Sequence, residues 1–218
     1  MKYPNAYAGI KKIFVSQILE IISVIFFLIG MIAVIAGAVS LTGETEAAAA
    51  GLVTAGVGVI LAIAGSIIAI IALILNLIGL NKAKNDEKNF QYAFWFVIIG
   101  LAATIITTFV QTANPWLAGW LEFVGTVMTV CAIEYSIVGI INLAGAVGNE
   151  SVEKLGRFTR ILVTILWVIV VIMRVWRNEL AANSTVSNIV AIVYLILELL
   201  VYILYIVLLS KAKKMLQE

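Results

Sequence analysis

Long apolar stretches alternate with short polar connections along the whole chain. An α-helix rises about 1.5 Å per residue, so about 20 apolar residues are enough to cross a hydrocarbon core of about 30 Å. The pattern predicts six transmembrane helices, with ends uncertain by a few residues. They lie at about 13–41, 49–80, 91–113, 117–147, 158–178 and 186–210. We therefore expect an all-α integral membrane protein with a single transmembrane domain over residues 1–218.

Composition supports this class and excludes several others. Of 218 residues, 63% are hydrophobic and 12% are charged, whereas soluble domains have about 45–50% and about 25%. The net charge of +2 is too small to predict a nucleic-acid surface. One cysteine, Cys131, and no histidine exclude a disulfide framework and a Cys/His metal cluster. We expect no cofactor and no metal, and the lipid bilayer as the main surroundings.

Basic residues predict the orientation in the membrane. With six spans, twelve lysines and arginines fall on one side, and only Arg174 and Arg177 lie near the other. Lys and Arg are enriched in cytoplasmic connections, so both termini are predicted to lie in the cytoplasm. The twelve are Lys2, Lys11, Lys12, Lys82, Lys84, Lys88, Lys154, Arg157, Arg160, Lys211, Lys213 and Lys214.

The six spans form three helical hairpins that resemble one another. Asn76-Leu77-Ile78-Gly79 near the end of the second span matches Asn142-Leu143-Ala144-Gly145 near the end of the fourth. A degenerate parallel repeat is predicted, with units of about 1–80, 81–147 and 148–218. The alternative is that the ends of membrane helices attract small and basic residues in any case.

Small residues follow one face of the first two spans. Gly30 and Gly37 belong to a seven-residue series on the first span, and Gly51, Gly58 and Gly65 to one on the second. Such faces allow helix backbones to approach closely in lipid. We expect the first two helices to pack as a tight antiparallel pair. The alternative is that these residues line a pore.

Two glutamates, Glu134 and Glu198, lie within apolar stretches. Each is about 18–20 Å from the cytoplasmic end of its helix. A charged side chain at this depth costs about 2.5–3.5 kcal/mol on insertion scales, so it requires a partner, a proton or a function. The sequence offers no cation at a matching depth, and we expect both carboxyls to lack an ionic partner.

Several polar residues are candidate neighbours of these glutamates. Tyr194 and Tyr202 flank Glu198 four residues before and after, which places them on its helix face. Asn142 lies two turns from Glu134 on the same face. Weaker candidates follow: Glu20 in the first span, and Arg174, for which Glu122 or Glu179 is the expected partner.

Two functions remain open. In the first, Glu134 and Glu198 exchange protons for a small cationic or polar substrate, in a small transporter or in a substrate-binding membrane subunit. In the second, they are neutral hydrogen-bonded acids in a structural or accessory protein, which associates with itself or with another membrane protein. Transport predicts that the carboxyls face a cavity between the fourth and sixth helices, and a structural role predicts packed contacts.

Catalysis is not expected. The absence of histidine excludes a serine–histidine dyad and a histidine zinc site. The single aspartate, Asp86, lies in a polar connection, so no pair of aspartates can form within the membrane.

The residues 148–156, between the fourth and fifth spans, are also predicted to be a polar connection.

The segment Asn76–Ala83, followed by Asp86-Glu87-Lys88-Asn89-Phe90 and Ala93, carries a family resemblance. It resembles small six-span membrane proteins of Gram-positive bacteria, a group whose function is unassigned. The resemblance implies the topology and the cytoplasmic membrane of a bacterium as the location, and it implies no activity.

Overall fold

A computed structural model describes residues 2–40, 45–176 and 184–217 of the chain. Within these ranges the regular secondary structure consists of six α-helices, all long and apolar enough to cross a membrane. This confirms the predicted all-α fold with six helices that are long and apolar enough to span a membrane. The helices are α1 (Pro4–Ser40), α2 (Thr45–Ala83), α3 (Asn89–Val110), α4 (Pro115–Val147), α5 (Glu150–Val175) and α7 (Ser184–Gln217).

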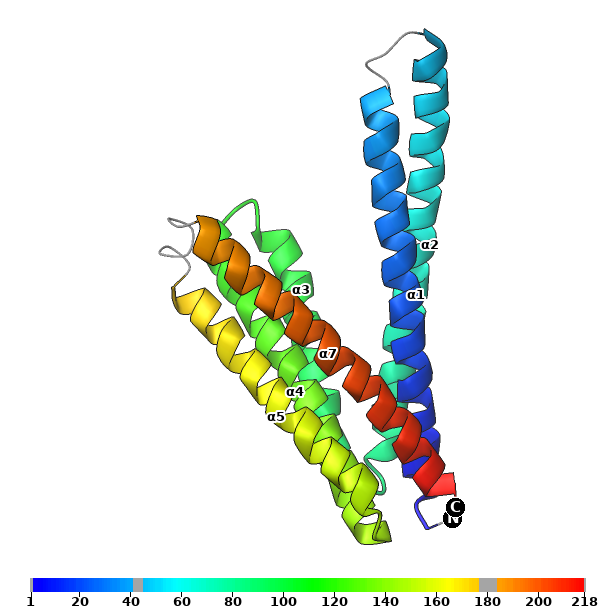
Figure 1. The fold of residues 1–218 in the computed structure, drawn as a ribbon, viewed down its shortest axis with the longest axis vertical. Helices are drawn as coiled ribbons and strands as arrows, with labels where there is room; N and C mark the ends of the chain where they lie inside the picture. Colours follow the sequence, from blue (N-terminus) through cyan, green and yellow to red (C-terminus); the bar gives the residue numbers. More distant parts are fainter. Residues whose placement is uncertain (1, 41–44, 177–183, 218) are drawn as a thin grey trace. The chain divides into compact units, whose positions relative to one another are not determined.

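The chain divides into two compact units (Figure 1). One unit, Lys12–Ile78, contains most of α1 and α2. The other contains Met1–Lys11 and Gly79–Glu218, which include α3, α4, α5 and α7.

In the first unit, α1 and α2 run side by side and their glycines meet (Figure 1). A Cβ added to Gly30 would lie 2.7 Å from the carbonyl oxygen of Gly58, and one added to Gly37 would lie 2.5 Å from that of Gly51. The Ser23 hydroxyl donates a hydrogen bond to the Gly65 carbonyl at 2.8 Å. Only residues without a side chain permit this backbone approach, which supplies van der Waals contact where lipid provides no hydrophobic driving force. The predicted tight packing of the two helices is confirmed, and the glycines lie in the contact between them.

In the second unit, α4 is central, because it contacts α3, α5 and α7. The backbones of α3 and α4 approach at Gly100 and Gly125, where a Cβ on Gly100 would lie 3.4 Å from the Gly125 carbonyl oxygen. Phe90 is fully buried, and its ring fills the space beside Gly139. Helix α4 begins at Pro115, two residues before the predicted start, and the Asn114 side chain caps it by accepting from the backbone N–H of Leu117 at 3.1 Å.

The turn between α4 and α5 is much shorter than predicted. Gly148 adopts a left-handed conformation (φ 78°) and ends α4, and the Asn149 side chain caps α5 by accepting from the backbone N–H of Val152. Helix α5 therefore begins at Glu150, so the prediction of a polar connection over 148–156 was wrong. The charged residues of its first turns are compatible with a helix, because ion pairs one turn apart stabilise a solvated helix surface. Glu153 and Arg157 form such a pair at 2.7 Å.

The connection between α2 and α3 joins three parts of the second unit. The Asp86 carboxylate accepts hydrogen bonds from the Ala6 backbone N–H at 2.7 Å and from the Asn5 side chain at 3.0 Å, and so caps the first turn of α1. Glu87 accepts from the Asn142 side chain of α4 at 3.2 Å. The start of α1, the α2–α3 connection and the end of α4 therefore lie at one end of this unit.

Candidate functional site

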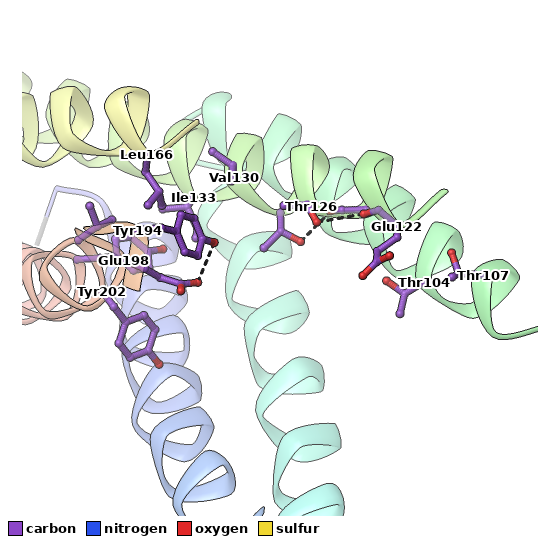
Figure 2. Close-up of a pocket in the computed structure, with 14 residues that line it drawn as sticks. Thr104, Thr107, Glu122, Thr126, Val130, Ile133, Leu166, Tyr194, Glu198 and Tyr202 are labelled. Atoms are coloured by element: carbon purple, nitrogen blue, oxygen red, sulfur yellow. Dashed lines mark hydrogen bonds between the residues drawn. The ribbon is translucent and has the colours of Figure 1, made fainter. Parts of the chain in front are cut away.

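A cavity of 420 Å³ lies among α3, α4, α5 and α7 (Figure 2). Its volume falls within the range of about 300–1,000 Å³ that is typical of small-molecule sites. Its lining combines apolar side chains, threonines, three tyrosines and two glutamates. The lining residues are Thr104, Thr107, Glu122, Gly125, Thr126, Thr129, Val130, Ile133, Leu166, Tyr194, Glu198, Val201, Tyr202 and Tyr205.

Glu198 lines this cavity together with tyrosines of its own helix. The Tyr194 hydroxyl donates a hydrogen bond to the Glu198 carboxylate at 3.3 Å, as the four-residue spacing predicts. Tyr202 lies one turn further along the same face and also lines the cavity, whereas the ring of Tyr205 is almost fully buried. Figure 2 shows the Tyr194 and Glu198 side chains close together at one end of the cavity.

Glu122 lines the cavity at its other end, with Thr104 and Thr107 of α3 nearby (Figure 2). The hydroxyls of Thr104 and Thr107 donate to carbonyls one turn back in their own helix, at 3.0 and 2.8 Å. Thr126 does the same toward the Glu122 backbone carbonyl at 3.0 Å. Each hydroxyl oxygen keeps acceptor capacity for a ligand in the cavity.

Glu134 is absent from the cavity lining and pairs instead with a cation. The Arg160 Nε of α5 donates to its carboxylate at 3.1 Å. The expectation that Glu134 lacks an ionic partner was therefore wrong. The short turn at Gly148 and Asn149 is the reason, because it starts α5 early enough to bring Arg160 alongside Glu134.

Asn142 and Glu20 have partners other than the two candidate glutamates. Asn142 donates to Glu87 in the α2–α3 connection. Glu20 belongs to the α1–α2 unit, where the Gln17 side chain donates to its carboxylate at 3.2 Å. Neither residue lines the cavity.

Arg174 has aromatic partners. Its guanidinium lies 5.1 Å from the ring centre of Trp120 and 5.8 Å from that of Phe123, which are cation–π distances. Between described residues, the ion pairs are those of Glu150, Glu153 and Glu134 on α4 and α5, so the expected Arg174–Glu122 pair is not formed. The other expected partner, Glu179, lies outside the described residues, as does Arg177.

The threonines that α3 contributes to the cavity were missed in the sequence. Thr104, Thr107 and Thr108 lie in the C-terminal half of α3, whose other residues are apolar, and two of them line the cavity. This cluster is a usable signal, because hydroxyls inside a membrane bundle mark either interhelical contacts or polar paths. In the described part of the chain, no group of three or more acidic or cysteine side chains is arranged to hold a metal ion.

No protein-family model, curated protein or solved structure matches the chain.

Proposed function

We propose that this multi-pass membrane protein is a small proton-coupled transporter, or the substrate-binding membrane subunit of one. The observation that carries the proposal is the position of Glu198 on the wall of a 420 Å³ cavity, held by Tyr194. Acidic residues within membrane helices that face a cavity commonly mark substrate or proton pathways.

The chemistry follows from the cost of charge in the membrane. Among the described residues, no cation forms an ion pair with the Glu198 carboxylate, which leaves it available to a ligand in the cavity. A cationic substrate supplies a counter-charge, and it competes with a proton for the same carboxylate. Occupation by a proton and occupation by a substrate become mutually exclusive, which is the basis of exchange.

The arrangement of Glu134 supports a different role for that residue. Its ion pair with Arg160 joins α4 to α5, and Glu134 does not line the cavity. We therefore assign proton exchange to Glu198 and a structural role to Glu134. The second candidate function is a structural or accessory protein that assembles with itself or with a larger membrane complex, and it requires packed contacts of this kind at both glutamates.

We further propose that both termini are cytoplasmic, that the membrane is the bacterial cytoplasmic membrane and that the protein is not an enzyme. Support for the orientation comes from the end of the second unit where the α1 start, the α2–α3 connection and the α4 end meet. Lys82, Lys84 and Lys88 lie in or next to this connection. The degenerate threefold repeat is retained as a proposal, since glycine contacts recur in the α1–α2 and α3–α4 pairs.

The test is a flux assay in proteoliposomes that contain a trapped pH-sensitive dye. A panel of alkylamines, amino acids and neutral sugars is added outside, and proton movement is recorded for the wild type, Glu198→Gln and Glu134→Gln. We expect at least one amine to drive proton movement in the wild type and in Glu134→Gln, and none in Glu198→Gln. Equal proton movement by Glu198→Gln and the wild type for every compound would refute the proposal.

A further inference from the structure

We infer that the cavity takes a linear organic dication, with one ammonium group at Glu198 and the other at Glu122. The inference rests on the proposed function, because it names the class of substrate for the same cavity. It goes further by giving a role to Glu122 and by predicting a preferred length of the substrate.

The two carboxylates lie at opposite ends of the cavity (Figure 2). Glu198 lies at the end where Ile133 of α4 contributes to the lining, and Glu122 lies eleven residues before Ile133 on the same helix. Eleven residues correspond to about 16 Å along an α-helix, which gives the order of length for a substrate that reaches both ends. A short monoamine can occupy one end only.

The wall of the cavity next to the Glu198 end is suited to methylene groups. Val130, Ile133 and Leu166 line it with aliphatic side chains, and Thr126 lies between them and Glu122 (Figure 2). At the Glu198 end, the rings of Tyr194 and Tyr202 add aromatic surface, and an ammonium group is attracted to the face of such a ring as well as to a carboxylate. At the Glu122 end, the Thr104 and Thr107 oxygens can accept from an ammonium group.

A bound metal ion fits this arrangement less well. Calcium and magnesium require about six or more oxygen ligands that converge on one point at 2.0–2.6 Å. The two carboxylates stand at separate ends of the cavity and do not converge on one point (Figure 2). Two separated anionic groups, with aliphatic side chains along part of the wall, match two separated cationic groups joined by an alkyl chain.

The charges balance in the exchange. Each carboxylate can hold either one proton or one ammonium group, and a proton that an ammonium group displaces passes to water. Two carboxylates then face two ammonium groups, so one dication replaces two protons and no net charge is left in the membrane. A monoamine replaces one proton and uses half of the site.

Binding to the full chain in lipid nanodiscs tests the inference. Isothermal titration calorimetry compares α,ω-diaminoalkanes of increasing length with monoaminoalkanes of the same length, and empty nanodiscs correct for partition into lipid. We expect the affinity of the diamines to pass through a maximum at one length and to exceed that of the matched monoamine at least tenfold. Glu122→Gln should remove this excess of diamine over monoamine affinity, whereas Glu150→Gln, at the exposed start of α5, should leave both affinities unchanged.

A second variant separates loss of charge from loss of fold. Glu122→Asp keeps the carboxylate on a shorter side chain, so it should keep the preference for diamines and move the maximum to a longer chain. If diamines and monoamines bind equally at every length, or if Glu122→Gln keeps the excess, the inference is overturned while transport of monoamines still supports the proposed function. If Glu198→Gln also leaves all amine binding and proton movement unchanged, the proposed function fails as well.

Discussion

Glutamine at Glu134, at Arg160 and at both positions together gives a double-mutant cycle for the ion pair between α4 and α5. The cycle reports the coupling energy of the pair, after subtraction of what each side chain contributes on its own. A matched control is available on α5, where Glu153 and Arg157 form a pair within one helix. The two pairs have comparable exposure but differ in whether they join separate helices.

The magnitude follows from exposure and geometry. The Nε–Oε1 distance is 3.1 Å, and the side chains are 51% (Arg160) and 29% (Glu134) exposed. Exposed pairs contribute about 0.2–1 kcal/mol, and removing one partner of a buried pair costs about 3–5 kcal/mol. For this intermediate case we expect a coupling energy of about 1–2 kcal/mol. The control pair, with 67% (Arg157) and 27% (Glu153) exposure, should give about 0.3–0.5 kcal/mol, as for pairs one turn apart on a helix.

Unfolding in mixed detergent micelles measures these energies. The fraction of SDS is raised, and loss of the folded state is followed by tryptophan fluorescence for each variant. A Glu134–Arg160 coupling energy no larger than that of the control pair would show that the contact does not hold α4 against α5. If Glu134→Gln then also loses proton movement, Glu134 belongs to the transport path and its assigned structural role is wrong.

Three further variants test the fold. Gly30→Ala should destabilise the protein by about 1–3 kcal/mol in the same unfolding assay, because the added Cβ meets backbone atoms of α2 at 2.7 and 2.9 Å and the helices must separate. Gly56→Ala, where the added Cβ has nothing within 4 Å, should be neutral or stabilising by up to about 1 kcal/mol. An equal loss of stability in both variants would contradict the close contact between α1 and α2 at Gly30. Asp86→Ala should lower stability by about 0.5–2 kcal/mol and increase proteolysis near Ala6, because the first turn of α1 loses its cap; unchanged proteolysis would contradict this.

The sequence was sufficient for the helices and for contacts within one helix. Apolar stretches of more than 20 residues have few alternatives to membrane helices, and the Tyr194–Glu198 bond follows from four-residue spacing on a single helix. The seven-residue glycine series also predicted the α1–α2 contact, because close backbone approach in lipid requires small residues at regular intervals.

The contacts between α4 and α5 depend on the turn that joins them, and the length of this turn was predicted wrongly from the sequence. The charged residues from Glu150 onward suggested a connection, but ion pairs one turn apart stabilise them as helix. A two-residue turn sets the register of α4 against α5, and this register brings Arg160 to Glu134. Glu122 was a weak candidate for a related reason, since the cavity requires three other helices to be placed around its side chain.

The cap on α1 has a consequence for the order of events during synthesis. The Asp86 carboxylate that accepts from the Ala6 backbone N–H lies 80 residues further along the chain. At about 5–20 residues per second, a ribosome needs about 4–16 s to add that interval. During this time α2 is also made, and its glycines become available to α1. The first turn of α1 therefore receives its cap only after the whole α1–α2 hairpin has been synthesised.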